Sequence, residues 1–240
     1  MSYTDLMIDL ETTSTKHNAA IIAIGLVKFN LNNPSVERKT LELLIDENSL
    51  TNYDFHTCPE TLKWWENQNE DVRNHVFYDQ PRVAIEEALD TINEFGKGVY
   101  NVWSQGSFDI NVLENAYEKT NKKPFWKFYQ IRDARTISSL MRDVPFISSL
   151  EQPKKPLNLH NPVEDCLHQI NVIQFVYNCI NNNTLISPIR KKAIRFDYTK
   201  DWVCKNCNAS NFAKRTTCFK CDAIKQSANT PPTNSFLSNE

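Results

Sequence analysis

The sequence lacks any apolar stretch close to the ~18 uninterrupted residues that a membrane-spanning helix needs. Its first residues, MSYTDLMIDLETT, show no basic region followed by an apolar core, so they do not resemble a secretion signal. We therefore expect no membrane association and a location in the cytoplasm, with the nucleus left open. Glycine is scarce, at four residues, which we take to have no bearing on catalysis, and no internal repeat is present.

The composition is that of an ordinary globular protein, with 40% apolar and 23% charged residues. A chain of 240 residues has room for one medium domain and a module too small to fold by core burial alone. Three of its seven cysteines are scattered, whereas four lie in one short stretch. Without a secretion signal, this pattern predicts a metal site and ordinary core thiols rather than disulfides. The clustered cysteines are Cys204, Cys207, Cys218 and Cys221.

The net charge of −2 conceals an uneven distribution. Residues 183–225 contain ten basic and three acidic side chains and carry +7, so the remainder carries −9. A basic segment on an acidic body suits a tail that binds phosphates and a body that gathers carboxylates. A solvated, lysine-rich surface would have the same composition.

Hydrophobic patterning predicts an α/β protein. Three early strands with short connections suggest an antiparallel meander, and a fourth strand lies among helices with apolar residues at helical spacing. The expected strands are residues 3–10, 19–29, 39–45 and 98–103, and the expected helices are 59–67, 81–95, 108–119, 133–141 and 161–180.

Acidic residues occur at the ends of three of these elements. Asp9 and Glu11 are two positions apart on a predicted buried strand, so both carboxylates project from one face, and burying them together requires a cation. Asp109 opens a helix after a strand, and His160 precedes Asp165 by five residues at the start of the last helix. Taken singly, each is also explained as a solvated strand end, a helix cap or a surface aspartate.

Together, the order and spacing of these residues resemble the DEDD exonuclease superfamily in its histidine subclass, over residues 4–180. The segments MIDLETT, NAAIIAIGLVKF, TLKWW, VWSQGSFDINVL and RDART are similar to the branch of phage-type exonuclease A and mycobacterial-type 3′–5′ exoribonucleases. The resemblance implies a ribonuclease-H-like fold, which is a mixed five-stranded sheet flanked by helices.

The same resemblance implies the roles of the polar residues. Asp9, Glu11, Asp109 and Asp165 would bind two Mg²⁺ or Mn²⁺ ions, since oxygen ligands suit hard cations. His160 would act as the general base on the attacking water, and the metals would stabilise an in-line phosphodiester attack.

Trp64 and Trp65 are adjacent, so they cannot both face the core of one helix. The resemblance places this region near the terminal nucleotide, where either ring could stack on a base; one core ring and one half-buried ring is the alternative. Arg132 and Arg135 could contact phosphate or form ion pairs on a helix surface. His168 is interpreted as a surface or core residue.

The four clustered cysteines form two CxxC pairs ten residues apart, a strong signature of one structural Zn²⁺. The pattern W-x-C-x2-C-x3-N-x6-C-x2-C resembles Ran-binding-protein-type zinc fingers, including Trp202 and Asn211. Members of that class bind single-stranded RNA or ubiquitin. The ubiquitin binders have Thr-Phe where this chain has Asn-Ala, whereas the places of the RNA-contacting residues are filled by Phe212, Lys214 and Arg215.

The leading hypothesis is a metal-dependent 3′–5′ exonuclease that releases nucleoside monophosphates from single-stranded nucleic acid, RNA more than DNA. A DNA exonuclease would share every catalytic residue. A non-catalytic adaptor that binds nucleic acid or ubiquitin is the alternative from another class, and homodimerisation is left open. The expected organisation is an exonuclease domain (1–182), a basic linker (183–199), a zinc finger (200–225) and a disordered tail (226–240).

Overall fold

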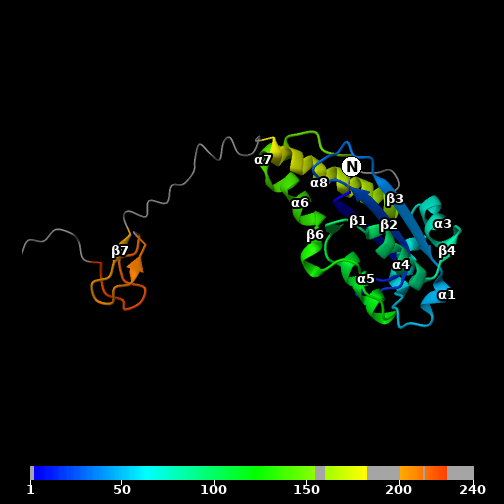
Figure 1. Cartoon of the computed structure of the whole chain (residues 1–240), viewed down its shortest axis with the longest axis horizontal. Helices are drawn as coiled ribbons and strands as arrows, with labels where there is room; N and C mark the ends of the chain where they lie inside the picture. Colours follow the sequence, from blue (N-terminus) through cyan, green and yellow to red (C-terminus); the bar gives the residue numbers. More distant parts are fainter. Residues whose placement is uncertain (1–2, 155–159, 183–200, 213, 226–240) are drawn as a thin grey trace, which may run out of the picture. The chain divides into compact units, whose positions relative to one another are not determined.

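A computed structural model describes residues 3–154, 160–182, 201–212 and 214–225. The expected linker and tail lie outside these residues. The chain divides into two compact units, residues 1–187 and 188–240 (Figure 1). Among the described residues, no helix has the length and apolar character that crossing a bilayer requires.

The first unit is built on one mixed sheet, with the strand order β4-β3-β2-β1-β5-β6. The pairs β1–β2 and β2–β3 are antiparallel, which confirms the expected meander, and the other three pairs are parallel. The ribonuclease-H-like α/β fold is thus confirmed, with a two-residue strand added at one edge. The strands are β1 (Asp5–Thr12), β2 (Ile21–Phe29), β3 (Lys39–Ile45), β4 (Arg82–Val83), β5 (Asn101–Ser104) and β6 (Ile131–Asp133).

Helices cover both faces of this sheet (Figure 1). Because side chains alternate along a strand, Leu6, Ile8 and Leu10 of β1 pack with α4 and α5. Met7 faces the opposite side and packs with α8. The helices are α1 (Glu47–Leu50), α2 (Pro59–Glu66), α3 (Glu70–Tyr78), α4 (Ile85–Gly96), α5 (Phe108–Lys119), η1 (Phe128–Gln130), α6 (Ala134–Asp143), α7 (Pro145–Ser148) and α8 (Pro162–Asn181).

Helix α8 packs unusually close to β2 at its first turn. A Cβ atom placed on Gly25 would lie 2.3 Å from the carbonyl carbon and oxygen of Pro162. The Asn161 side chain caps the helix by accepting a hydrogen bond from the Glu164 backbone. A glycine at position 25 is therefore what allows the start of α8 to rest directly on the sheet.

The short elements α1, η1, β6 and α7 were not expected, and two further regions also differ from the sequence-based expectation. The helix expected from Pro81 begins only at Ile85, because residues 82–83 extend the sheet beside β3. Helix α3 was not expected, although Asn69 caps it through two backbone N–H groups. Its short apolar stripe, Val72 and Val76, carries a weak periodic signal.

The second unit contains a two-stranded hairpin of β7 (Trp202–Val203) and β8 (Ser210–Asn211). A bridge between Thr217 and Ile224 closes the second half. Each half presents one CxxC pair.

Candidate active site and zinc centre

Asp9 and Glu11 lie on the face of β1 that is covered by α8, as their spacing predicts. Glu11 is buried, and Asp9 Oδ1 accepts a hydrogen bond from Gln169 Nε2 at 2.8 Å. Burial raises the pKa of Asp9 well above its ordinary value, with further increases from the charges of Asp109 and Asp165. Burial, followed by Asp9 and the other carboxylates, raises the pKa of Glu11 in the same way. The ionised forms of Asp9 and Glu11 are therefore disfavoured in the protein without a bound cation.

Asp109 joins this pair from the neighbouring strand. It is the second residue of α5, which follows β5, and β5 runs parallel to β1. The Leu10 backbone N–H donates to Asp109 Oδ1 at 3.2 Å, which fixes the carboxylate beside the end of β1. Burial raises the pKa of Asp109 to about 6, although hydrogen bonds from its own backbone and Leu10, and the charge of Arg135, act in the opposite direction.

His160 and Asp165 approach from the start of α8. The His160 backbone N–H donates to Asp165 Oδ2 at 3.0 Å, and His160 adopts a positive φ of 72°. Burial raises the pKa of Asp165, against the lowering effects of the His160 backbone and of the His160 and His168 side chains. One ligand atom from each of Glu11, His160 and Asp165 lies within 4.8 Å of the others.

These side chains line a single cleft of about 520 Å³. Its buried carboxylates repel one another, so a divalent cation with oxygen ligands fits the site: it would neutralise charge that the protein alone leaves poorly compensated. The lining residues are Asp9, Leu10, Glu11, Gln105, Phe108, Asp109, Arg135, His160, Asp165 and Gln169.

Two polar residues of this cleft, Gln105 and Gln169, were not predicted from the sequence. Gln169 lies one helical turn after Asp165, a spacing that could have indicated its position. Gln105, by contrast, sits in the turn between β5 and α5, where no periodicity applies. Arg135 lines the cleft, whereas Arg132 donates to the carbonyls of Tyr129 and Ile131.

A second cleft of about 470 Å³ shares Glu11 and Phe108 with the first. Trp64 and Trp65 both line it, but in different ways. The Trp64 side chain is 43% exposed. Trp65 is only 2% exposed and donates from Nε1 to the Thr12 carbonyl at 3.0 Å. Trp64 is thus the ring that is available to a ligand, and Trp65 anchors α2.

The His160 ring lies against this tryptophan pair. Its centroid is 4.8 Å from Trp64 and 6.1 Å from Trp65, in edge-to-face arrangements. The imidazole therefore stands between the aromatic cleft and the carboxylates. His168, for comparison, is partly buried along α8 and does not line either cleft.

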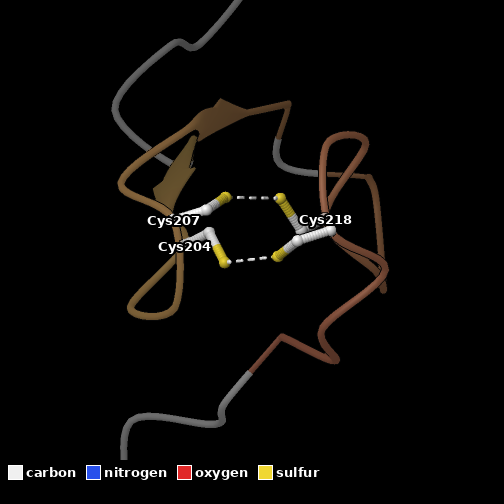
Figure 2. Close-up of side chains that lie close together, drawn as sticks. Cys204, Cys207 and Cys218 are labelled. Atoms are coloured by element: carbon white, nitrogen blue, oxygen red, sulfur yellow. Dashed lines mark hydrogen bonds between the residues drawn. The ribbon is translucent and has the colours of Figure 1, made fainter.

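The four clustered cysteines of the second unit converge on one point, with all four sulfur atoms within 4.8 Å of one another. Figure 2 shows the two halves presenting their thiols face to face. The Sγ atoms of Cys204 and Cys221 are 3.6 Å apart, and those of Cys207 and Cys218 are 3.5 Å apart. Four convergent thiolates suit tetrahedral Zn²⁺.

Asn211 supports this cluster from within. It is buried, its Oδ1 accepts from the Phe219 backbone N–H at 3.0 Å, and its Nδ2 donates to the Ala209 carbonyl and to Cys218 Sγ. The asparagine in the finger pattern thus joins the two cysteine pairs. It is a structural residue rather than part of the finger surface.

Phe212, Lys214 and Arg215 are all exposed on the finger. Phe219, which is not among the predicted contact residues, is also exposed, and the Arg215 guanidinium lies 6.0 Å from its ring centroid. The exposed surface of the finger therefore carries two aromatic rings with basic side chains.

Comparison with known proteins agrees with this geometry. The family model described as the 3′–5′ exoribonuclease Rv2179c-like domain matches residues 4–177, and that of the zinc finger in Ran-binding protein and others matches residues 199–227. A phage T4 protein named exodeoxyribonuclease is 23% identical over 203 residues, covering 71% of this chain and 88% of its own.

Two solved nuclease structures are also similar. The nuclease domain of 3′hExo, a DEDDh family member solved with rAMP, aligns with a TM-score of 0.46 and 15% identity, covering 75% of this chain and 93% of its own. The RNase domain of yeast Pop2 gives 0.43 and 12%, covering 75% and 78%. From the match over residues 4–177, the chain belongs to the 3′–5′ exoribonuclease Rv2179c-like domain family, and it is a 3′–5′ exonuclease with a C-terminal zinc ribbon of the Ran-binding-protein type.

Proposed function

We propose that this exonuclease degrades single-stranded RNA from its 3′ end and releases nucleoside monophosphates. The observation that carries the proposal is the convergence of four carboxylates and His160 in one cleft, brought from the end of β1 and the starts of α5 and α8. An adaptor that only binds nucleic acid has no need for buried, mutually repelling carboxylates.

In this proposal, Asp9, Glu11, Asp109 and Asp165 hold two Mg²⁺ or Mn²⁺ ions. When bound, the ions supply an activated water and neutralise charge on the phosphodiester. His160 accepts the proton of the attacking water, and the hydrogen bond from its backbone to Asp165 keeps the imidazole beside the cleft.

The second cleft accepts the terminal nucleotide. It shares Glu11 and Phe108 with the carboxylate cleft, so a phosphate at the carboxylates leaves the adjoining sugar and base beside the aromatic rings. Trp64 stacks on that base because its side chain is accessible. Trp65 holds α2 in place, and only the edge of its ring lines the second cleft.

The zinc finger binds single-stranded RNA in this proposal. Exposed Phe212 offers a face for base stacking, and Lys214 and Arg215 offer charge to phosphates. The finger would retain the strand between cleavage events, with residues 183–199 as the basic segment that joins it to the exonuclease domain (1–182).

DNA is the second candidate substrate. The family description names an exoribonuclease, whereas the phage relative is named an exodeoxyribonuclease. We favour RNA because the family model, which matches nearly the whole first unit, is described as an exoribonuclease, and because the class of zinc fingers that the cysteine pattern resembles includes binders of single-stranded RNA.

Digestion of matched strands tests the proposal. RNA and DNA oligonucleotides of one sequence, labelled at the 5′ end, are incubated with the full chain and Mg²⁺ or Mn²⁺. We expect a ladder that shortens from the 3′ end, faster on RNA, and no product from Asp9→Asn. Faster cleavage of DNA would select the second candidate. Binding without any product, equal for wild type and Asp9→Asn, would support the adaptor instead.

A further inference from the structure

Residues 119–132, KTNKKPFWKFYQIR, contain five basic side chains and no acidic one. The rest of the chain outside residues 183–225 carries a net charge of −9, so this basic segment lies within an acidic part of the protein. Two pairs of adjacent aromatic residues, 125–126 and 128–129, are interspersed among these charges. This composition is typical of surfaces that bind single-stranded nucleic acid. The basic residues are Lys119, Lys122, Lys123, Lys127 and Arg132.

The structure sorts the aromatic residues of this segment into two groups. Trp126 is buried, and Phe125 packs over Gly96. Phe128 is 84% exposed and Tyr129 is 52% exposed, with their ring centroids 5.5 Å apart. Two large rings directed to solvent side by side are unusual on a protein that has buried their neighbours.

Hydrogen bonds hold these two rings in their exposed positions. The Lys127 backbone N–H donates to Gln130 Oε1 at 2.9 Å, and Arg132 donates to the Tyr129 carbonyl at 2.8 Å. Gln130 Nε2 donates to the carbonyl of Tyr100, whose ring is also exposed. These hydrogen bonds fix the conformation of the loop and connect it to the residue that precedes β5.

This surface lies away from the carboxylate cleft. Strands β5 and β6 are parallel, and the exposed rings precede β6, whereas Asp109 follows β5. Helix α5 runs back from Asp109 to Lys119, and ten residues at 1.5 Å each span about 15 Å. A terminal nucleotide in the cleft cannot reach these rings, but a longer strand can.

We propose that Tyr100, Lys123, Lys127, Phe128 and Tyr129, here called the aromatic ledge, form a second contact for single-stranded nucleic acid. Bases upstream of the nucleotide being removed stack on the aromatic rings of the ledge. Lys123 and Lys127, which are both exposed, bind the phosphates of the same strand. This inference rests on the proposed function for the orientation of the strand. It extends that function from a cleft for one nucleotide to a binding track.

A nucleic acid suits the ledge better than a second copy of the chain. In a two-fold dimer the same patch faces itself, so the lysines of both copies would be brought together. A polyanion removes that repulsion and also supplies planar bases for the rings. We therefore take dimerisation through the ledge as the outcome that would contradict the proposal.

The test compares Phe128→Ala/Tyr129→Ala with Tyr78→Ala, a control that removes an exposed ring from α3 whose exposure lies between those of Phe128 and Tyr129. Binding of a fluorescent single-stranded RNA and its DNA counterpart is measured in the full chain carrying Asp9→Asn, which prevents cleavage without a chelator. We expect the double variant to weaken binding about tenfold or more, and the control to leave it unchanged. Lys123→Glu/Lys127→Glu should also reduce the salt dependence of binding.

Kinetic measurements on a long strand and on a small substrate distinguish the ledge from the proposed exonuclease function. With an active chain, the double variant should raise KM for long strands but leave turnover of a p-nitrophenyl ester of a nucleoside monophosphate unchanged. Unaltered binding and KM would overturn the ledge, as would light scattering that shows the wild type as a dimer and the double variant as a monomer. A wild type that binds RNA but hydrolyses neither substrate would refute the exonuclease mechanism, and the ledge would still be judged by the binding data.

Discussion

Gly25 of β2 and Pro162 of α8 approach so closely that the glycine has no room for a methyl group. An added Cβ would lie 2.3 Å from the Pro162 carbonyl and 2.7 Å from the Val163 nitrogen, all backbone atoms. Asp165 lies on the first turn of the same helix. Gly25 therefore sets the depth at which α8 presents Asp165.

Gly25→Ala should push the start of α8 away from the sheet. Overpacking of this kind costs about 1–3 kcal/mol, and a displacement of about 1 Å at a catalytic group costs about a hundredfold in rate. We expect a lower Tm together with a kcat loss of about that size. The matched control is Gly96→Ala, where the three atoms nearest to the added Cβ belong to the Phe125 side chain rather than to the backbone. Equal activity of the two variants would contradict the role of Gly25.

Much of the first unit could be predicted from the sequence because its signals are local. Alternation along β1 separates Leu6, Ile8 and Leu10 from Asp9 and Glu11, and the structure places these two groups on opposite faces of the sheet. The short strands β4 and β6 were missed. Each is too short to show a period, and each is formed by pairing with a strand that is distant in the chain.

The candidate site likewise contains residues that the sequence pattern predicts and residues that only the folded structure reveals. The four carboxylates and His160 were selected from order and spacing, and the structure brings all five into one cleft. The cleft's polar neighbours, Gln105 and Gln169, have no motif of their own. The choice between Trp64 and Trp65 also required the structure, because adjacency shows that their environments differ but not which ring is buried.

The tryptophan pair offers a matched comparison. Trp64→Ala should leave stability within about 0.5 kcal/mol, since the ring is largely a surface residue, but weaken binding of single-stranded RNA about tenfold. Trp64→Phe should restore most of that binding. Trp65→Ala should cost about 3–5 kcal/mol, because it empties a core site and leaves the Thr12 carbonyl without its partner. Thermal unfolding and RNA titration measure the two effects, and equal destabilisation by both alanine variants would contradict the assignment.

The buried carboxylates should make stability depend on pH when magnesium and manganese are withheld. The pKa of Asp109 is raised from 3.8 to about 6 by burial. A raised pKa means that the folded state binds the proton more tightly, so this contribution is complete below pH 4 and is lost as the pH rises through about 6. Asp109→Asn should therefore raise the Tm at pH 7 by about 2–4 °C for each kcal/mol of relieved charge burial. The difference should shrink at pH 5.

Asp133→Asn is the control of opposite sign. Burial disfavours the Asp133 charge, but hydrogen bonds from Thr136 and from backbone N–H groups outweigh it and lower the pKa. Its stabilising contribution is present above the ordinary pKa, so Asp133→Asn should lower the Tm at pH 7. Magnesium should then raise the Tm of wild type and of Asp133→Asn more than that of Asp109→Asn. An equal magnesium effect on all three would show that Asp109 does not bind the cation.

The zinc ribbon should be unable to fold without its metal. Among its described residues, the buried ones are Cys204, Cys218 and Asn211, which is too little to form an apolar core. Cys218→Ser should abolish stoichiometric zinc binding and collapse the finger's dispersed NMR signals into the narrow range of an unfolded chain. It should also weaken RNA binding, while turnover of a p-nitrophenyl nucleotide stays the same because the carboxylate cleft belongs to the other unit. Cys179→Ala, which removes a thiol of α8, should retain both zinc and RNA binding. A Cys218→Ser chain that kept its zinc and a folded finger would exclude the four-cysteine site.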